Sequence, residues 1–386
     1  MYKSLIIILF LVLFSTVKAS AQQPLDLASA DSITYQYYLA GNWDKLITAG
    51  NEAINQHIDF KWLRQRMGYA YFMKFDYFAS LKQYQKALTF DENDVNTRTY
   101  LYYCGLNTSN LTFANFQASK LSQEAQQNLG IKPLKIMDVL DFEYNYKLNN
   151  INTRTNPNYW RLGINSQLGY RLNLYQAVSD YTQTISSLTL NQFEYFVLAD
   201  YAINPHLELD IAYHYLNTKT DTATYKGNMI FARLSSRINR LDLGLSGSVL
   251  DYDNENFGQI GIHAGLTLPG QYNVYIKSSL YQMLAANNNR IVYSQSIGAL
   301  FFKKFWTEGN ITLGNLKNYI DANGLYIYNS VDATTFRTGL SIFWYVGKKI
   351  TLFGNYTYDY KQTESTNNIT TKYNQHSISS GIIWKL

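Results

Sequence analysis

The sequence predicts an α + β multidomain protein in which a short helical array precedes a transmembrane antiparallel β-barrel of about 14 strands. Two periodicities lead to this prediction. Between Asp31 and Leu129, apolar residues recur at the three- and four-residue spacing of amphipathic helices. From Asp138 to Leu386, apolar and polar residues alternate, as in strands. The stretch Tyr159–Leu172 alternates with only Ser166 out of phase, which makes it longer than most strands of soluble sheets.

The composition agrees with a barrel and argues against other classes. The chain of 386 residues contains 35 Tyr and 20 Phe, and such rings form the interfacial girdles of membrane barrels. The net charge of +5 is modest and the basic residues are dispersed, so no nucleic-acid partner is expected. Cys104 has no second cysteine to pair with and is predicted to be a buried thiol. No spacing typical of a metal site occurs, and no cofactor or metal is expected.

The N-terminus has the features of an export signal. Lys3 precedes the apolar run Leu5–Phe14, and Ala19-Ser20-Ala21 supplies small residues for cleavage. We therefore predict a signal peptide over residues 1–21, a helical domain over 22–131 and a barrel over 132–386. No later window holds about eighteen apolar residues, so helical membrane spans are not expected.

Six helices in three hairpins are predicted for the helical domain: Ser32–Leu39, Lys45–Gln56, Trp62–Lys74, Tyr77–Phe90, Asn96–Leu106 and Phe113–Leu129. At an offset of about 34 residues, Tyr37 aligns with Tyr71 and Ala53 with Ala87, which is the tetratricopeptide period. The second unit, Lys61–Asp94, resembles the tetratricopeptide pattern of small and large residues, although Ser80 and Glu92 depart from it. The candidates for repeat packing or a partner-binding face are Trp43, Trp62, Gly68, Tyr71, Tyr84 and Ala87. They either pack between helices or line a concave surface for a peptide or partner helix.

The predicted strands follow Pro133, a residue that cannot continue a helix. They are Asp138–Leu148, Asn158–Leu172, Leu174–Ser187, Leu190–Ala202, His206–Leu216, Tyr225–Ile238, Leu241–Tyr252, Phe257–Leu268, Tyr272–Leu284, Arg290–Phe302, Phe305–Leu316, Thr334–Val346, Ile350–Lys361 and Thr371–Leu386. Tight turns alternate with longer polar links such as Asn149–Pro157 and Asn217–Thr224. Outer-membrane barrels keep short turns on the periplasmic side, so both termini and the helical domain are expected in the periplasm.

Strand parity predicts which side chains face the lumen. A Lys or Arg at the lipid midplane would cost about 2–4 kcal/mol, so the polar parity should face inward. The lumen-lining candidates are Glu143, Arg161, Arg171, Glu208, Asp210, Arg233, Arg237, Asp242, His263, Glu308 and Arg337. Opposite charges such as Arg161 and Glu143 could brace the wall or select an ion or saccharide. The longest link, Lys317–Ala333, could extend the barrel as a hairpin or fold inward and narrow the pore.

The order of signal, helical repeats and barrel, together with the terminal strand ending Ile382-Ile383-Trp384-Lys385-Leu386, resembles the YaiO-like outer-membrane barrels. The final Leu departs from the commoner Phe. The chain also looks like a reduced version of exopolysaccharide exporters. The resemblance implies an outer-membrane location, contact with outer-membrane lipid, and recognition by the barrel-assembly machinery.

Three functions remain open at this point. The first is a non-enzymatic barrel for passage or secretion of a polar solute or polysaccharide, whose periplasmic repeats recruit a protein partner. The second is a barrel-embedded lipid-modifying enzyme, which we do not expect because His214 and His263 lie on the polar parity with no nucleophile motif nearby. The third is a plugged barrel that anchors the helical domain. The short tether Gly130–Met137 predicts that this domain lies close to the barrel mouth.

Overall fold

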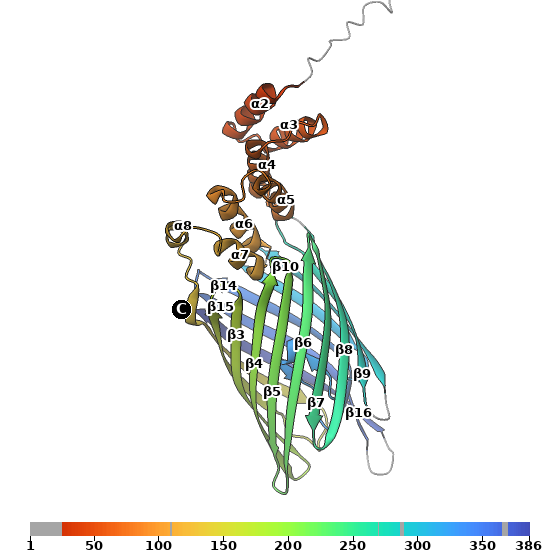
Figure 1. The fold of residues 1–386 in the computed structure, drawn as a ribbon. Coiled ribbons are helices and arrows are strands. Elements are labelled where there is room, and N and C mark those ends of the chain that lie inside the picture. Colours follow the sequence, from red (N-terminus) through yellow and green to blue (C-terminus); the bar gives the residue numbers. More distant parts are fainter. Residues whose placement is uncertain (1–24, 109, 269, 286–288, 365–369) are drawn as a thin grey trace, which may run out of the picture.

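The computed structural model describes residues 25–108, 110–268, 270–285, 289–364 and 370–386. The chain forms a helical domain that stands on one end of a β-barrel (Figure 1). The predicted signal peptide lies outside the described residues, as do residues 286–288 and 365–369 of two predicted connections.

Seven helices make up the described part of the helical domain: α2 (Leu27–Leu39), α3 (Trp43–Asn55), α4 (Lys61–Met73), α5 (Tyr77–Leu88), α6 (Val95–Asn107), α7 (Leu111–Ala118) and α8 (Gln123–Asn128). Asp76, Asp94 and Asn110 cap α5, α6 and α7 by accepting backbone N–H bonds. The single helix predicted over Phe113–Leu129 is wrong. The Ser122 hydroxyl caps a new helix there, so the chain breaks into α7 and α8.

Two apolar clusters hold the helices together. The first cluster lies between α2, α3 and α4 and contains Leu46, Leu63 and Met67. The second contains Tyr84, Leu101, Cys104 and Phe113, between α5, α6 and α7. Cys104 is buried as predicted; its thiol donates a hydrogen bond to Ser80 Oγ at 3.3 Å, and burial raises its pKa to about 12. The thiol is therefore neutral and unreactive at physiological pH.

Gly68 lets α4 and α5 approach closely. A Cβ at this position would lie 2.8 Å from Cε2 of Tyr84. We expect Gly68→Ala to destabilise the helical domain by about 1–3 kcal/mol, because the Tyr84 ring must move. Unfolding of the full-length protein, followed by its helical circular dichroism signal, measures this. The double variant with Tyr84→Leu should lose less than the sum of the two single losses; strict additivity would contradict the close contact.

Fourteen antiparallel strands close into the barrel: β1 (Leu134–Asn149), β2 (Asn158–Leu168), β3 (Leu172–Ile185), β4 (Leu188–Asn204), β5 (Leu207–Lys219), β6 (Thr224–Ile238), β7 (Leu241–Tyr252), β8 (Glu255–Thr267), β9 (Tyr275–Leu284), β10 (Arg290–Phe301), β11 (Phe305–Leu313), β14 (Ala333–Val346), β15 (Ile350–Glu364) and β16 (Thr370–Lys385). Closure comes from β1 and β16, which pair from Val139↔Lys385 to Asn149↔Gln375. The predicted fold class and strand number are confirmed. Each of the fourteen described strands pairs with a neighbour on both sides, so the described sheet has no open edge.

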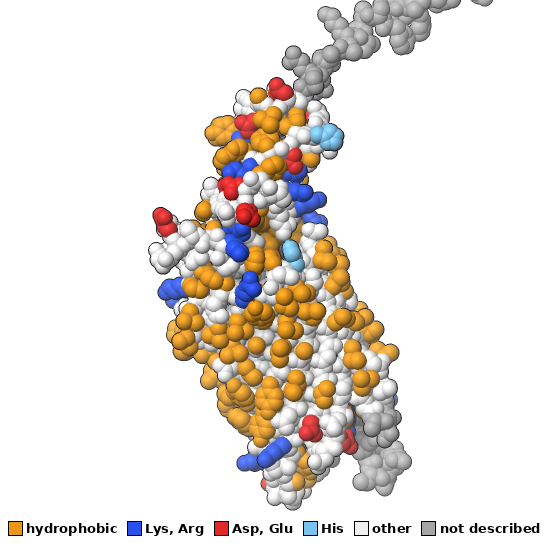
Figure 2. Space-filling view, in the orientation of Figure 1, with side chains coloured by type: hydrophobic (Ala, Val, Ile, Leu, Met, Phe, Trp, Pro, Cys, Tyr) orange, Lys and Arg blue, Asp and Glu red, His pale blue; other side chains and the backbone are white. Residues whose placement is uncertain are grey.

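The outer wall of the barrel is apolar. Along β7 and β8, alternate residues including Leu243, Leu245, Ile260 and Ile262 are exposed, and Leu340 and Ile342 continue the pattern on β14. Figure 2 shows a broad band of hydrophobic side chains over the visible face of the barrel, with charged residues gathered toward its ends. Among the described residues, no helix is both long and apolar enough to span a membrane.

The two ends of the barrel differ. The end that carries the helical domain, here the near rim, includes the turns at 169–171, 205–206, 239–240, 302–304 and 347–349. The opposite end, the far rim, includes the connections at 150–157, 186–187, 220–223, 253–254 and 314–332. The expected alternation of short and long connections is only partly present, because the far rim also contains tight turns at 186–187 and 253–254. Their residues Ser186, Asp253 and Asn254 adopt positive φ, which permits such tight reversals.

Candidate functional site in the barrel lumen

The longest described connection folds back into the barrel. Residues 314–332, here the inward loop, contain β12 (Ile320–Asp321), the 3₁₀ turn η1 (Ala322–Gly324) and β13 (Tyr326–Ile327). β12 and β13 pair with each other in a separate two-stranded sheet, while β11 pairs directly with β14. Of the two alternatives left open by the sequence, the inward fold is the one observed.

Apolar contacts hold one side of the inward loop. Ile320 packs in a buried cluster with lumen-facing residues of the β3–β7 wall: Ala177, Phe196, Ala212, Leu216, Met229, Phe231 and Leu250. A second cluster joins Leu316 and Tyr319 to Tyr281, Met283 and Val292 on β9 and β10. The loop therefore fills part of the lumen with packed side chains.

Polar contacts hold the other side. The Tyr326 hydroxyl donates to Glu143 Oε2 at 2.9 Å, and Arg161 Nη1 donates to the same hydroxyl at 3.1 Å. Arg161 Nη2 also lies 3.3 Å from Asp141 and 3.1 Å from Glu143. This network joins β1, β2 and the loop across the lumen. It contains the Arg161–Glu143 pair that strand parity suggested.

Further contacts fix the base and tip of the loop. Arg154 forms a bidentate ion pair with Asp332: Nε donates to Oδ2 at 2.7 Å and Nη2 donates to Oδ1 at 2.8 Å. Both side chains are buried. At the tip, His214 Nδ1 lies 2.8 Å from the Gly324 carbonyl oxygen. The Cβ of any larger residue at Gly324 would meet the Met229 side chain, and φ there is +93°. The loop is thus attached to several strands by side-chain contacts.

Most predicted lumen-lining residues lie on the inner face of the wall. Arg233 Nη2 contacts Asp210 at 2.6 Å, Arg337 contacts Asp359 at 3.2 Å, and Arg237 pairs with Asp242. His263 lies between the hydroxyls of Ser246 and Ser279, at 2.8 and 3.0 Å. Glu308 is half-buried on β11.

Arg171 is a correction, because β2 ends at Leu168 and Gly169 turns the chain with φ +90°. Arg171 therefore lies exposed at the near rim, where its guanidinium stacks on Phe116 of α7. It does not line the lumen.

A polar chamber of about 320 Å³ lies between the near rim and the helical domain. Asn110, Leu111 and Thr112 at the start of α7 form one side of it. The barrel contributes Asp200, Glu208, Arg233, Arg237, Asp242, His263 and Lys277. Several predicted lumen residues are therefore brought together in one space.

Polar contacts tie the helical domain to the near rim. Arg240 Nη2 lies 3.1 Å from Asp76, and Arg237 Nη1 donates to the Thr108 carbonyl oxygen at 2.7 Å. Thr112 donates to Glu208, and the Tyr170 hydroxyl donates to Gln126 at 2.6 Å. The short tether and these contacts keep the domain next to the barrel mouth, as the sequence predicted.

Removing two of these ties should loosen the domain. We expect Arg237→Ala with Arg240→Ala to speed proteolytic cleavage across residues 130–133 by up to about tenfold, the factor that corresponds to about 1.4 kcal/mol. A matched control, Lys348→Ala with Lys349→Ala, removes the same charge from the same rim and should leave cleavage unchanged. Equal cleavage of both variants would contradict a docked domain.

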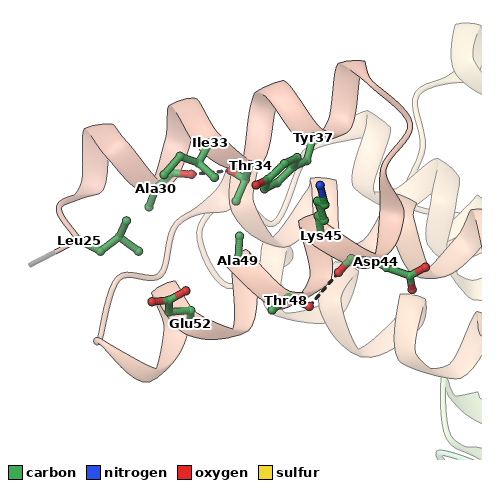
Figure 3. A pocket seen from close by; sticks show the side chains of 10 residues that line it. All are labelled: Leu25, Ala30, Ile33, Thr34, Tyr37, Asp44, Lys45, Thr48, Ala49 and Glu52. Carbon is green, nitrogen blue, oxygen red and sulfur yellow. Dashed lines mark hydrogen bonds between the residues drawn. The ribbon is translucent and has the colours of Figure 1, made fainter. Parts of the chain in front are cut away.

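The predicted residues of the helical domain fall into two groups. Gly68 and Tyr84 lie in the α4–α5 contact, and Ala87 is buried on α5. Trp43 and Tyr71 pack against the first apolar cluster. Trp62 differs, since it is 54% exposed beside Lys61. Near the free end of the domain, α2 and α3 border a pocket of about 380 Å³ that includes Ile33, Tyr37 and Lys45 (Figure 3).

The apolar residues of the lumen were not among the predicted site residues. Phe196, Leu216, Met229, Phe231 and Leu250 all share the parity of the charged lumen residues on neighbouring strands. A water-filled lumen would not favour large apolar side chains. Their presence on the inner parity was the signal for a segment that packs inside the barrel.

The fold and site define a closed fourteen-stranded barrel with a helical domain on one rim and a loop packed in its lumen. No protein-family model and no curated protein matches the chain. Its YaiO-like resemblance therefore remains an expectation.

Solved structures offer only distant similarity. A bacterial polysaccharide outer membrane secretin is 9% identical, with a TM-score of 0.41 over 65% of this chain and 99% of that chain. The toluene transporter TodX of P. putida is 6% identical, with a TM-score of 0.42 over 65% and 91% of the two chains. The KdgM porin, solved with disordered oligogalacturonate, is 9% identical, with a TM-score of 0.33 over 64% and 99%. These values are too low to assign a family or a function.

Proposed function

We propose that this protein is a non-enzymatic outer-membrane barrel that controls passage of a polar solute or polysaccharide, with the inward loop as its gate. The apolar outer wall suits lipid. The inner wall carries ion pairs such as Arg161–Glu143 and Arg233–Asp210. The observation that carries the proposal is the direct pairing of β11 with β14, from Phe305↔Trp344 to Leu313↔Phe336. The tip of the loop can leave the lumen without breaking the hydrogen-bonded wall.

We further propose that the helical domain lies in the periplasm and recruits a protein partner there. Its support is the position of the domain over the near rim, next to the polar chamber. The α2–α3 pocket and the exposed side chains of Leu27, Ile33, Tyr35 and Leu39 leave the free end of the array available for a further helix. A partner bound there could act on the barrel through α7.

A static anchor is the second candidate, favoured by the two apolar clusters around the loop. A lipid-modifying enzyme has less support. His214 and His263 both lie inside the wall, with His214 almost fully buried against the loop, so neither ring faces lipid.

Liposome swelling distinguishes a gated pathway from a static anchor. The full-length protein and a chain in which a short Gly/Ser link replaces residues 315–332 are reconstituted at equal amounts, and uptake of neutral sugars of increasing size is compared. We expect slow uptake by the first and fast uptake of small sugars by the second. A barrel shortened at 220–223 serves as the control and should stay slow. Slow uptake by every form would instead favour the anchor.

A further inference from the structure

Three carboxylates meet on the inner wall where β4, β5, the inward loop and the helical domain come together. Asp200 and Asp210 are direct cross-strand partners, and Glu208 precedes Asp210 by two residues on the same face of β5. One oxygen from each carboxylate lies within 4.8 Å of the other two. This spacing fits a single coordination shell around Ca²⁺, whose oxygen ligands lie about 2.3–2.6 Å from the ion.

Burial of Asp210 makes its negative charge costly without a further positive charge. Asp210 is 0% exposed, and its Oδ1 has no hydrogen-bond partner among the described residues. Its other oxygen, Oδ2, contacts Arg233 at 2.6 Å and Asn323 at 3.4 Å. A buried carboxylate oxygen that lacks a partner is unfavourable unless an ion, a proton or water satisfies it.

The charge balance favours a divalent ion. Three carboxylates against the single guanidinium of Arg233 leave a formal local charge of −2. The other basic group nearby, Arg237, is paired with Asp242. Lys277 on β9 and His263 on β8 also line the chamber. In the strand order they are farther from the cluster on β4 and β5 than Arg233, which is on β6.

We propose that Asp200, Glu208 and Asp210 bind one hard divalent cation, with Ca²⁺ preferred because its shell tolerates irregular oxygen ligands. The ion would join three parts of the molecule. Asp210 accepts a hydrogen bond from Asn323 in η1, and Glu208 accepts one from Thr112 in α7. The site lies at the joint between wall, loop and helical domain, and its existence does not depend on what passes through the barrel.

Calorimetric titration of the chelator-treated, full-length protein in detergent with CaCl₂ tests the site, and MgCl₂ provides the comparison. We expect one saturable Ca²⁺ site per chain and a rise in the thermal unfolding midpoint on binding. Asp210→Asn and Asp200→Asn should each weaken Ca²⁺ binding by at least about tenfold. Glu208→Gln, at a less buried position, provides a further variant should either substitution prevent folding.

Glu308→Gln is the matched control, because it removes a carboxylate on β11 that lies outside the cluster. It should keep the wild-type affinity. Absence of saturable binding of either ion by the wild-type protein would overturn the proposal and indicate that the carboxylates share protons instead. Binding that survives Asp200→Asn, Glu208→Gln and Asp210→Asn alike would place the ion elsewhere and also overturn it.

Discussion

Replacing Ile320 with aspartate is expected to open the lumen. Ile320 is buried in the cluster formed with Phe196, Leu216 and Phe231, so a carboxylate there would cost several kcal/mol while the loop stays packed. The loop should therefore spend much of its time away from the wall, while the strand pairing of the barrel persists. Single-channel recording in planar bilayers should show long conducting periods for the variant and rare ones for the wild type.

Val331→Asp is the control for this variant. Val331 belongs to the same loop but is 63% exposed, so the same substitution should leave the recordings unchanged. If neither variant shows added conductance, the loop does not obstruct the pathway or no pathway exists. Two conducting variants would show a general effect of added charge in this loop.

The second large effect is expected for Arg161→Ala. Its side chain is 10% exposed and lies between Asp141, Glu143 and Tyr326. Removing it leaves two carboxylates close together in a buried position, and breaking a buried ion pair in this way costs about 3–5 kcal/mol. The wild type and the variant can be compared by the midpoint of urea unfolding in detergent.

Arg171→Ala supplies a charge-matched comparison and should be close to neutral, because Arg171 lies exposed at the rim. Adding Glu143→Gln to Arg161→Ala should restore part of the lost stability, since it removes one of the two carboxylate charges left without Arg161. A variant as stable as the wild type would contradict the role of this network in holding the loop.

The barrel was predictable because its physical constraint acts on every strand. A wall that is apolar outside must repeat its pattern at a period of two along its whole length, so the strand number could be obtained without any tertiary information. Strand ends were less predictable. The pattern of Tyr159–Leu172 continues past Leu168, but Gly169 turns the chain with positive φ. Likewise, the apolar spacing of Phe113–Leu129 concealed the cap at Ser122.

The sequence located the link Lys317–Ala333 but could not decide whether it folds inward, because the contacts of the inward loop join distant parts of the chain. Tyr326 meets Glu143 and Arg161, and Ile320 bonds to Gln259 through both its N–H and its carbonyl oxygen. Periodicity carries no information about such pairs. The same holds for the carboxylate cluster, since parity places Glu208 and Asp210 on the inner face but does not determine the register that brings Asp200 beside them.

Amide hydrogen exchange of the unmodified, full-length protein tests the position of the inward loop most directly. The Ile320 N–H donates to Gln259 at 3.0 Å, and the Asn318 and Tyr328 N–H groups donate within the loop at 2.8 and 2.9 Å. If the loop packs in the lumen, these amides should exchange orders of magnitude more slowly than those of the exposed turn at 220–223. Exchange of residues 318–328 as fast as in that turn would show that the loop does not fill the barrel, and would contradict the gate.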